Sequence, residues 1–164
     1  MYSMTNTVFA PSYIQKLFKS ESNDPSPIQI PLETFIEHIM ARTRISTNTI
    51  VTAFMYLDRL KRKHPRCKGS PGSGHRLVLS AIMLAAKYMY DDTFDNVAWA
   101  TVSSGLFHLS HVNHMEMELL HFLNFELFIH IDDWYCFYAN LERRIRPVQA
   151  PIPCGNPAGW PLFS

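Results

Sequence analysis

Residues 77–90 (LVLSAIMLAAKYMY) constrain the fold most strongly, because they are apolar on nearly every side of a helix. A helix of this kind must be buried by neighbouring elements, whereas an amphipathic helix buries only one stripe. The segment is shorter than the roughly 20 apolar residues that span a bilayer. A loop rich in glycine and proline, residues 65–74, precedes it. We therefore predict a central, buried helix in an all-α domain.

Further segments repeat apolar residues with a period near 3.6, the spacing that places them on one face of a helix. The first has Pro31 in its first turn, and the second follows a cap at Ser46 or Thr47 and ends in basic residues. Strand-like alternation is scarce, so we expect five helices around the buried one. The five are predicted near residues 32–40, 48–64, 97–104, 111–127 and 133–146, with Ser110 capping the fourth and Asp132 or Asp133 starting the fifth.

Prolines divide the chain into parts. Three of them close an irregular first part that ends near residue 31, and within it residues 13–18 indicate a short amphipathic helix. Five prolines and two glycines after residue 146 are incompatible with a regular helix. The predicted organisation is an N-terminal segment (1–30), a helical domain (31–129), an additional C-terminal helix (130–146) and a proline-rich tail (147–164).

Composition excludes several classes of protein. A content of 47% hydrophobic and 18% charged residues in 164 residues is typical of one soluble domain. The formal net charge of +1 lacks the basic excess of nucleic-acid binders, and no segment is long enough for a membrane span. Three widely spaced cysteines suit a reducing compartment. We therefore expect an intracellular protein, in the nucleus or cytoplasm, that binds neither membrane nor nucleic acid.

Five short sequences on the predicted helices form a recognisable set. They are Tyr56-Leu57-Asp58-Arg59-Leu60, Ala81-Ile82-Met83-Leu84-Ala85-Ala86-Lys87-Tyr88, Asp95-Asn96-Val97-Ala98-Trp99-Ala100, Met115-Glu116-Met117-Glu118-Leu119-Leu120 and Leu123-Asn124-Phe125-Glu126-Leu127. They resemble the helices of the cyclin box and occur in the order and spacing found in cyclins. The chain thus resembles a single-box cyclin over about residues 31–145, and it is most similar to the yeast phosphate-pathway (Pho-type) branch on Asn96, Trp99 and Ala100. The resemblance implies an all-α fold, a five-helix cyclin box with flanking N- and C-terminal helices.

The resemblance also implies a function, which is to bind and activate a cyclin-dependent protein kinase without a cofactor or catalytic residues of its own. Lys87 and Glu116, 29 positions apart (116 − 87), would form the polar centre of the kinase-binding face. In cyclins this pair bonds the backbone around the regulatory helix of the kinase and positions its glutamate for catalysis. The apolar contacts around the pair would come from Leu84, Tyr88, Leu120 and Leu127.

Each of these residues also has a purely structural interpretation. Lys87 alone is consistent with a solvated helix end, and Glu116 with an acid near a helix N-terminus. For Asp58 and Arg59 we favour a structural role as an ion pair within the bundle. The apolar contact residues are equally consistent with positions in the core.

Two alternative functions remain open at this stage. Four histidines (His108, His111, His114, His121) crowd one region and suggest a small metal-binding protein or enzyme, although no further ligand is evident and we favour surface histidines. The basic residues 59–68 suggest nucleic-acid binding, as in a cyclin-fold transcription adaptor, although a helix C-terminus explains them equally. No catalytic motif is present in the sequence, so we predict a protein that is not an enzyme.

Overall fold

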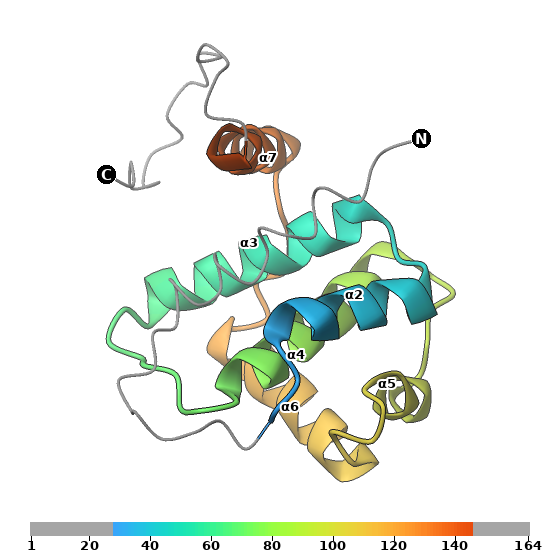
Figure 1. Ribbon diagram of the computed structural model, residues 1–164. Helices are drawn as coiled ribbons and strands as arrows, with labels where there is room; N and C mark the ends of the chain where they lie inside the picture. The colour runs from blue at the N-terminus through green and yellow to red at the C-terminus, as the bar shows by residue number, and fades with distance from the viewer. Residues whose placement is uncertain (1–27, 146–164) are drawn as a thin grey trace. The chain divides into compact units, whose positions relative to one another are not determined.

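The computed structural model describes residues 28–145, which form α-helices and no β-strand (Figure 1). The all-α prediction is confirmed for these residues. The chain divides into two compact units, of which the first ends at Leu127 and the second begins at Phe128. The amphipathic segment expected at residues 13–18 and the proline-rich tail (147–164) lie outside the described residues. The helices are α2 (Leu32–Thr43), α3 (Thr47–Lys63), α4 (Ser73–Met89), α5 (Asn96–Val102), α6 (Leu109–Phe122) and α7 (Ile131–Ile145).

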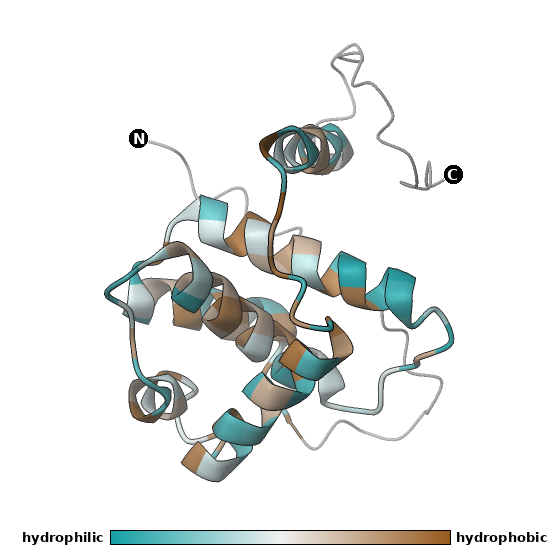
Figure 2. Ribbon diagram, turned by 180° about the vertical axis from the view of Figure 1, so that it is seen from behind, coloured by the Kyte–Doolittle hydropathy of each residue, from teal (hydrophilic) through white to brown (hydrophobic). Residues whose placement is uncertain are grey.

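Helix α4 is the centre of the first unit, as the apolar sequence predicted. Nearly every side chain from Val78 to Ala86 is buried, and α4 contacts α2, α3 and α6. Figure 2 shows the apolar colour concentrated along the middle of α4, whereas α3 ends in polar turns. Helix α5 packs mainly on α6 and α2, and α7 belongs to the second unit. Among the described residues, the first unit contains four helices besides α4, and the fifth further helix, α7, belongs to the second unit.

Helix α4 begins at Ser73, within the residues 65–74 that the sequence predicted as a loop. Gly72 makes this start possible because its φ of 81° lies in the left-handed region that glycine adopts readily. The turn is then fixed by His75, which is buried against the Phe35 ring at a centroid distance of 5.2 Å. The Nε2 atom of His75 donates to the carbonyl oxygen of Ile30 at 2.8 Å.

Side-chain caps set the starts of three other helices. The Ser46 hydroxyl accepts from the Thr49 amide at 3.3 Å at the start of α3, as the sequence indicated. Asp95 Oδ1 accepts from the Ala98 amide at 2.8 Å and begins α5. The expectation of Ser110 as the cap of α6 is wrong, because His108 is the N-cap and its Nδ1 accepts from the Ser110 amide.

The C-terminal half of α3 holds the turn that follows α6. The turn contains two non-glycine residues with positive φ, Asn124 (53°) and Phe125 (57°), a conformation that external contacts must stabilise. These contacts bring Leu127 back against α3 and therefore determine where its side chain lies. The Tyr56 hydroxyl donates to the Leu127 carbonyl oxygen at 3.1 Å, and Arg59 donates to the Glu126 carbonyl oxygen. Lys63 Nζ donates to the Leu123 carbonyl oxygen at 3.2 Å and pairs with the Glu126 carboxylate at 2.9 Å.

In the second unit, α7 is amphipathic, with acids in its first turn. The rings of Trp134 and Tyr138, one turn apart, stack at 5.3 Å with an interplanar angle of 7°. The Tyr138 hydroxyl donates to Glu142 at 3.1 Å on the same helix. Across residues 28–145, no helix combines the length and hydrophobicity that crossing a membrane requires.

Candidate functional site

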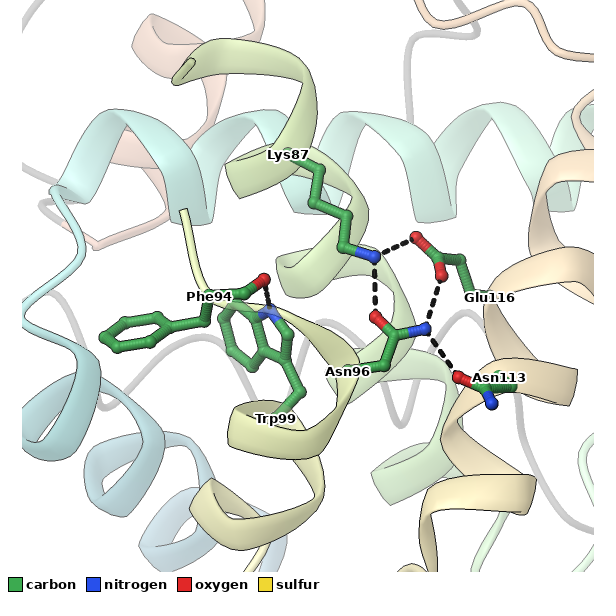
Figure 3. Close-up of polar contacts among 6 residues, drawn as sticks. All are labelled: Lys87, Phe94, Asn96, Trp99, Asn113 and Glu116. Carbon is green, nitrogen blue, oxygen red and sulfur yellow. Dashed lines mark hydrogen bonds and ion pairs between the residues drawn. The ribbon is translucent and has the colours of Figure 1, made fainter. Parts of the chain in front are cut away.

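Lys87 lies in the last turn of α4 and reaches two acceptors on neighbouring helices (Figure 3). Its Nζ atom donates to Glu116 Oε1 of α6 at 2.7 Å and to Asn96 Oδ1 of α5 at 2.5 Å. The structure therefore brings together the two residues that the sequence predicted as a polar centre. It also places a third polar residue, Asn96, beside both of them.

Asn96 completes a closed network of hydrogen bonds. Its Nδ2 atom donates to Glu116 Oε2 at 2.8 Å and to Asn113 Oδ1 at 2.7 Å, so Lys87, Asn96 and Glu116 each bond to the other two (Figure 3). The Asp95 cap fixes the start of α5 and thereby the position of Asn96. A network in which every member is paired holds its side chains more rigidly than an isolated surface ion pair does.

The packing of α5 keeps this network in place. Trp99 is fully buried, and its Nε1 atom donates to the Phe94 carbonyl oxygen at 3.1 Å (Figure 3). The two rings also meet edge to face at a centroid distance of 5.8 Å. The loop between α4 and α5 is therefore tied to the indole, which sets how closely Asn96 approaches Lys87.

The network retains hydrogen-bonding capacity toward a partner. The Lys87 side chain is 28% exposed and that of Glu116 is 15% exposed, so both can be reached from outside. Lys87 uses two of its three N–H donors within the described residues, and the side chain of Asn113 is bonded there through its oxygen. This arrangement can bind peptide N–H and C=O groups. It offers no activated nucleophile.

The four apolar residues predicted to flank the polar centre differ in exposure. Tyr88 is 50% exposed, and Leu120 and Leu127 are half-buried, so three of the four predicted contact residues present surface. Leu84 is buried in the core with 4% of its surface exposed, which leaves little area for a partner. Met117, adjacent to Glu116 in the sequence, is 47% exposed.

The structural interpretations of Lys87 and Glu116 do not describe their surroundings. Glu116 is in the third turn of α6, which begins at Leu109, so it is too far from the N-terminus for a helix-dipole role. Lys87 is bonded to two side chains and is not a solvated helix end. Asn113 was also missed, although its spacing of three residues from Glu116 places both on one face of α6.

Asp58 and Arg59 both contact other parts of the bundle. Asp58 is buried, and its carboxylate pairs with Arg62 Nε, one turn further along α3, at 2.9 Å. Residues four apart share a helix face, which allows this contact. Arg59 donates to the Glu126 carbonyl oxygen in the turn after α6. These contacts support the structural role that we favour for both residues, while an ion pair between the two stays a prediction.

The histidine and basic clusters have local partners. His108 caps α6, and His114 Nε2 lies 3.2 Å from Glu118 Oε1. His121 Nδ1 donates to the Met117 carbonyl oxygen at 2.7 Å. Within residues 28–145, no three His, Cys, Asp or Glu side chains gather closely enough to hold a metal ion. In the basic run, Lys61 donates to the Cys67 oxygen at 2.7 Å, while Arg62 and Lys63 pair with carboxylates.

The chain matches a protein family model and several known proteins. Residues 5–128 match the family model described as "Cyclin, N-terminal domain". The chain is 37% identical over 142 residues to PHO85 cyclin-1 of Saccharomyces cerevisiae, covering 80% of this chain and 50% of that protein. PHO85 cyclin-9 of the same yeast is 33% identical over 69% of the chain and 38% of its own length. Cyclin-U1-1 of Arabidopsis thaliana is 31% identical over 71% of the chain and 55% of its own length. The chain thus spans about half the length of these relatives or less.

Proposed function

The chain belongs to the cyclin family, and we propose that it is a regulatory subunit that binds and activates a cyclin-dependent protein kinase in cell-cycle or nutrient signalling. Two of its relatives are named as cyclins of PHO85. We therefore propose a kinase of that type as the partner. The observation that carries the proposal is the network of Lys87, Asn96 and Glu116 on three adjoining helices.

Activation in this proposal is a matter of positioning. A protein kinase is active only when a lysine of its catalytic lobe pairs with a glutamate on its regulatory helix. Lys87 and Glu116 supply a donor and an acceptor that bond the backbone beside that helix, and the apolar residues around them press it inward. The cyclin contributes shape and hydrogen bonds, and the kinase performs the chemistry.

The network makes this contact favourable by ordering its side chains before binding. A free lysine loses rotamer entropy of as much as about 2 kcal/mol when it is fixed in an interface. Lys87 is already held by two hydrogen bonds in the structure, so a smaller part of that cost falls on association.

The apolar residues are suited to the surrounding contact. Aromatic side chains beside a desolvated polar centre commonly carry much of the energy of an interface. Tyr88 extends from the last turn of α4 directly after Lys87, and Leu120 follows Glu116 by one turn on α6. Leu127 is held next to α3 by the Tyr56 hydroxyl. In this proposal, Leu84 packs beneath these residues and supports them.

The test is recovery of a kinase from lysate of the source cells, followed by a kinase assay on a histone-type substrate. The wild-type chain is expected to recover an active cyclin-dependent kinase. The double variant Lys87→Ala, Glu116→Ala is expected to lose roughly 2–5 kcal/mol of binding free energy, because it removes a partly buried charged contact. Its circular dichroism spectrum and thermal midpoint show whether it is folded.

A matched control is available on the same two helices. Arg76 of α4 and Glu118 of α6 form another ion pair, at 3.3 Å, and both are more exposed. The double variant Arg76→Ala, Glu118→Ala is expected to recover the kinase normally. Equal loss in both double variants would contradict the role of Lys87 and Glu116, and failure of the wild type to recover any kinase would overturn the proposed function.

A further inference from the structure

A cavity of about 790 Å³ opens between α4, α6 and the loop that follows α3. We name it the α4–α6 groove. Its buried lining consists of the apolar residues Leu60, Met115 and Leu119 and the polar Ser80, with Leu77 half-buried and Phe122 exposed at its side. The volume is in the range of sites that bind small ligands or the side chains of a peptide. An apolar side chain entering the groove would be removed from water on several sides.

The exposed rim of the α4–α6 groove is basic. Arg66 and Lys68 come from the loop after α3 and Arg76 from α4, and all three are exposed. Glu118, which pairs with Arg76 at 3.3 Å, supplies the one carboxylate among the described lining residues. Three cationic groups and one anionic group therefore border an apolar cavity. Such a surface attracts an anionic ligand that also carries an apolar group.

The α4–α6 groove is separate from the kinase-binding face. Arg76 and Lys87 are 11 positions apart on α4 (87 − 76), which is about 16 Å along the helix axis. On α6, Glu116 and Glu118 are two positions apart, so they point about 200° away from each other around the helix. Glu116 pairs with Lys87 at one end of α4, and Glu118 pairs with Arg76 near the other end. A partner centred on Lys87 therefore contacts a surface other than the α4–α6 groove.

We propose that the α4–α6 groove binds an acidic peptide segment of a substrate of the bound kinase. In this arrangement a leucine or phenylalanine of the peptide enters the cavity, and flanking carboxylates pair with Arg66 and Arg76. Arginine is suited to this task because its planar group binds a carboxylate through two parallel hydrogen bonds. The proposal rests on the proposed function, because it supplies the kinase complex with a means of holding its substrate.

The first test selects peptides from a random-peptide phage library on the immobilised full-length chain. The selected peptides are expected to combine a leucine or phenylalanine with neighbouring aspartates or glutamates. Binding of the corresponding synthetic peptides, measured by fluorescence polarisation, is expected to weaken roughly tenfold or more in the variant Arg66→Glu, Arg76→Glu, because two attractive contacts become repulsive. Binding should also weaken as salt concentration rises.

Two matched variants control for charge and for the kinase-binding face. Arg42→Glu, Arg44→Glu makes the same change of charge at exposed positions at the end of α2, away from the groove, and is expected to bind the peptides normally. Lys87→Ala, Glu116→Ala is also expected to bind them normally. Selection of basic peptides, or equal weakening in the Arg42 and Arg44 variant, would overturn the proposal.

The chain itself supplies the competing occupant, because residues 1–27 precede the described part of the chain. A synthetic peptide of residues 1–27 is therefore added to the binding assay. No competition is expected. If this peptide displaces the selected ones and binds in the groove, the occupant is the chain's own segment and the proposal is overturned.

Kinase recovery and kinase activity test the proposed function separately from peptide binding. The Arg66→Glu, Arg76→Glu variant is expected to recover the kinase from lysate and to phosphorylate a histone-type substrate normally. Its phosphorylation of a substrate fused to a selected peptide should fall by roughly tenfold, in step with the loss of binding. Unchanged phosphorylation of the fused substrate would contradict a docking role while leaving the kinase proposal intact.

Discussion

Two ion pairs between a basic residue of α4 and a glutamate of α6 differ in distance and in solvent exposure. Arg76 and Glu118 meet at 3.3 Å with side chains 50% and 42% exposed. Lys87 and Glu116 meet at 2.7 Å with side chains 28% and 15% exposed, and Asn96 bonds to both. The first pair forms in water, where an ion pair contributes little. The second is held by a network, so its side chains are ordered before any partner arrives.

The same pair of helices therefore supplies a solvated ion pair at one end and an ordered one at the other. The geometry of α6 makes this possible, since residues two positions apart face opposite ways around a helix. Helix α5 decides which end becomes ordered, because its first residue, Asn96, lies beside Lys87. Substitutions at the centre of α4, at each of its ends and within the network are therefore expected to differ in their effects on stability and on kinase affinity.

The largest effect is expected at the centre of α4, on which both ends depend. Ile82 is fully buried, and Ile82→Ala should lower the free energy of unfolding by about 2–5 kcal/mol through lost burial and the cavity left behind. Urea denaturation followed by circular dichroism measures this change. A loss well below about 1 kcal/mol would show that the core tolerates a gap there, contrary to its close packing.

A smaller effect is expected from removing Asn96 while leaving the ion pair. Asn96→Ala deletes three side-chain hydrogen bonds, to Lys87, Glu116 and Asn113. Kinase affinity should fall roughly tenfold, because Lys87 and Glu116 are then less well ordered. Surface plasmon resonance with the recovered kinase measures it, with Asn113→Ala as the milder comparison. Affinity equal to the wild type would mean that the ion pair suffices without the network.

At the N-terminal end of α4, a modest pH dependence is expected from His75. Burial lowers the pKa of His75 below its ordinary value of 6.5, and its hydrogen bond to the Ile30 oxygen only partly opposes this. The unfolded chain therefore binds a proton more readily than the folded chain. The stability contributed by neutral His75 is complete above about pH 6.5 and is lost as the pH falls toward the lowered pKa.

Thermal denaturation of the wild type and of His75→Gln across this range tests the expectation. The wild type should lose more stability on acidification than the variant does. Parallel curves for the two proteins would show that His75 protonation is not coupled to folding.

The smallest effect is expected at the exposed pair. Arg76→Met removes a single contact to Glu118, so the free energy of unfolding should change by no more than about 1 kcal/mol and kinase affinity should not change. Chemical denaturation and the same kinase-binding assay check both values. A drop in kinase affinity comparable to that of Lys87→Met would remove the contrast between the two ends of α4.

Much of the fold was predictable from the sequence because its signals are strong and local. The all-round apolar segment 77–90 predicted the buried helix, and Ser46 marked the start of α3. The first turn of α4 was not predictable, because Gly72 and Gly74 resemble loop residues until His75 is seen packed on Phe35. The cap of α6 was misassigned since histidine is a less common cap than serine.

The candidate site was predictable in part. The resemblance pointed to Lys87 and Glu116 as partners, and the structure brings them into contact. The roles of Asn96 and Asn113 depend on how α5 packs against α6 near the end of α4, which no local pattern encodes. Whether Leu84 faced the core or the surface was equally inaccessible, because α4 is apolar on both sides. Tertiary packing settles that question by burying Leu84 and exposing Tyr88.

The most direct test of the central claim is amide hydrogen exchange of the chain with and without the recovered kinase. Binding centred on the network is expected to protect residues 84–97 and 113–127, while residues 66–77, which include the loop after α3 and the start of α4, exchange unchanged. Protection confined to residues 66–77, with the Lys87 end of α4 unaffected, would contradict the assignment of the kinase-binding face.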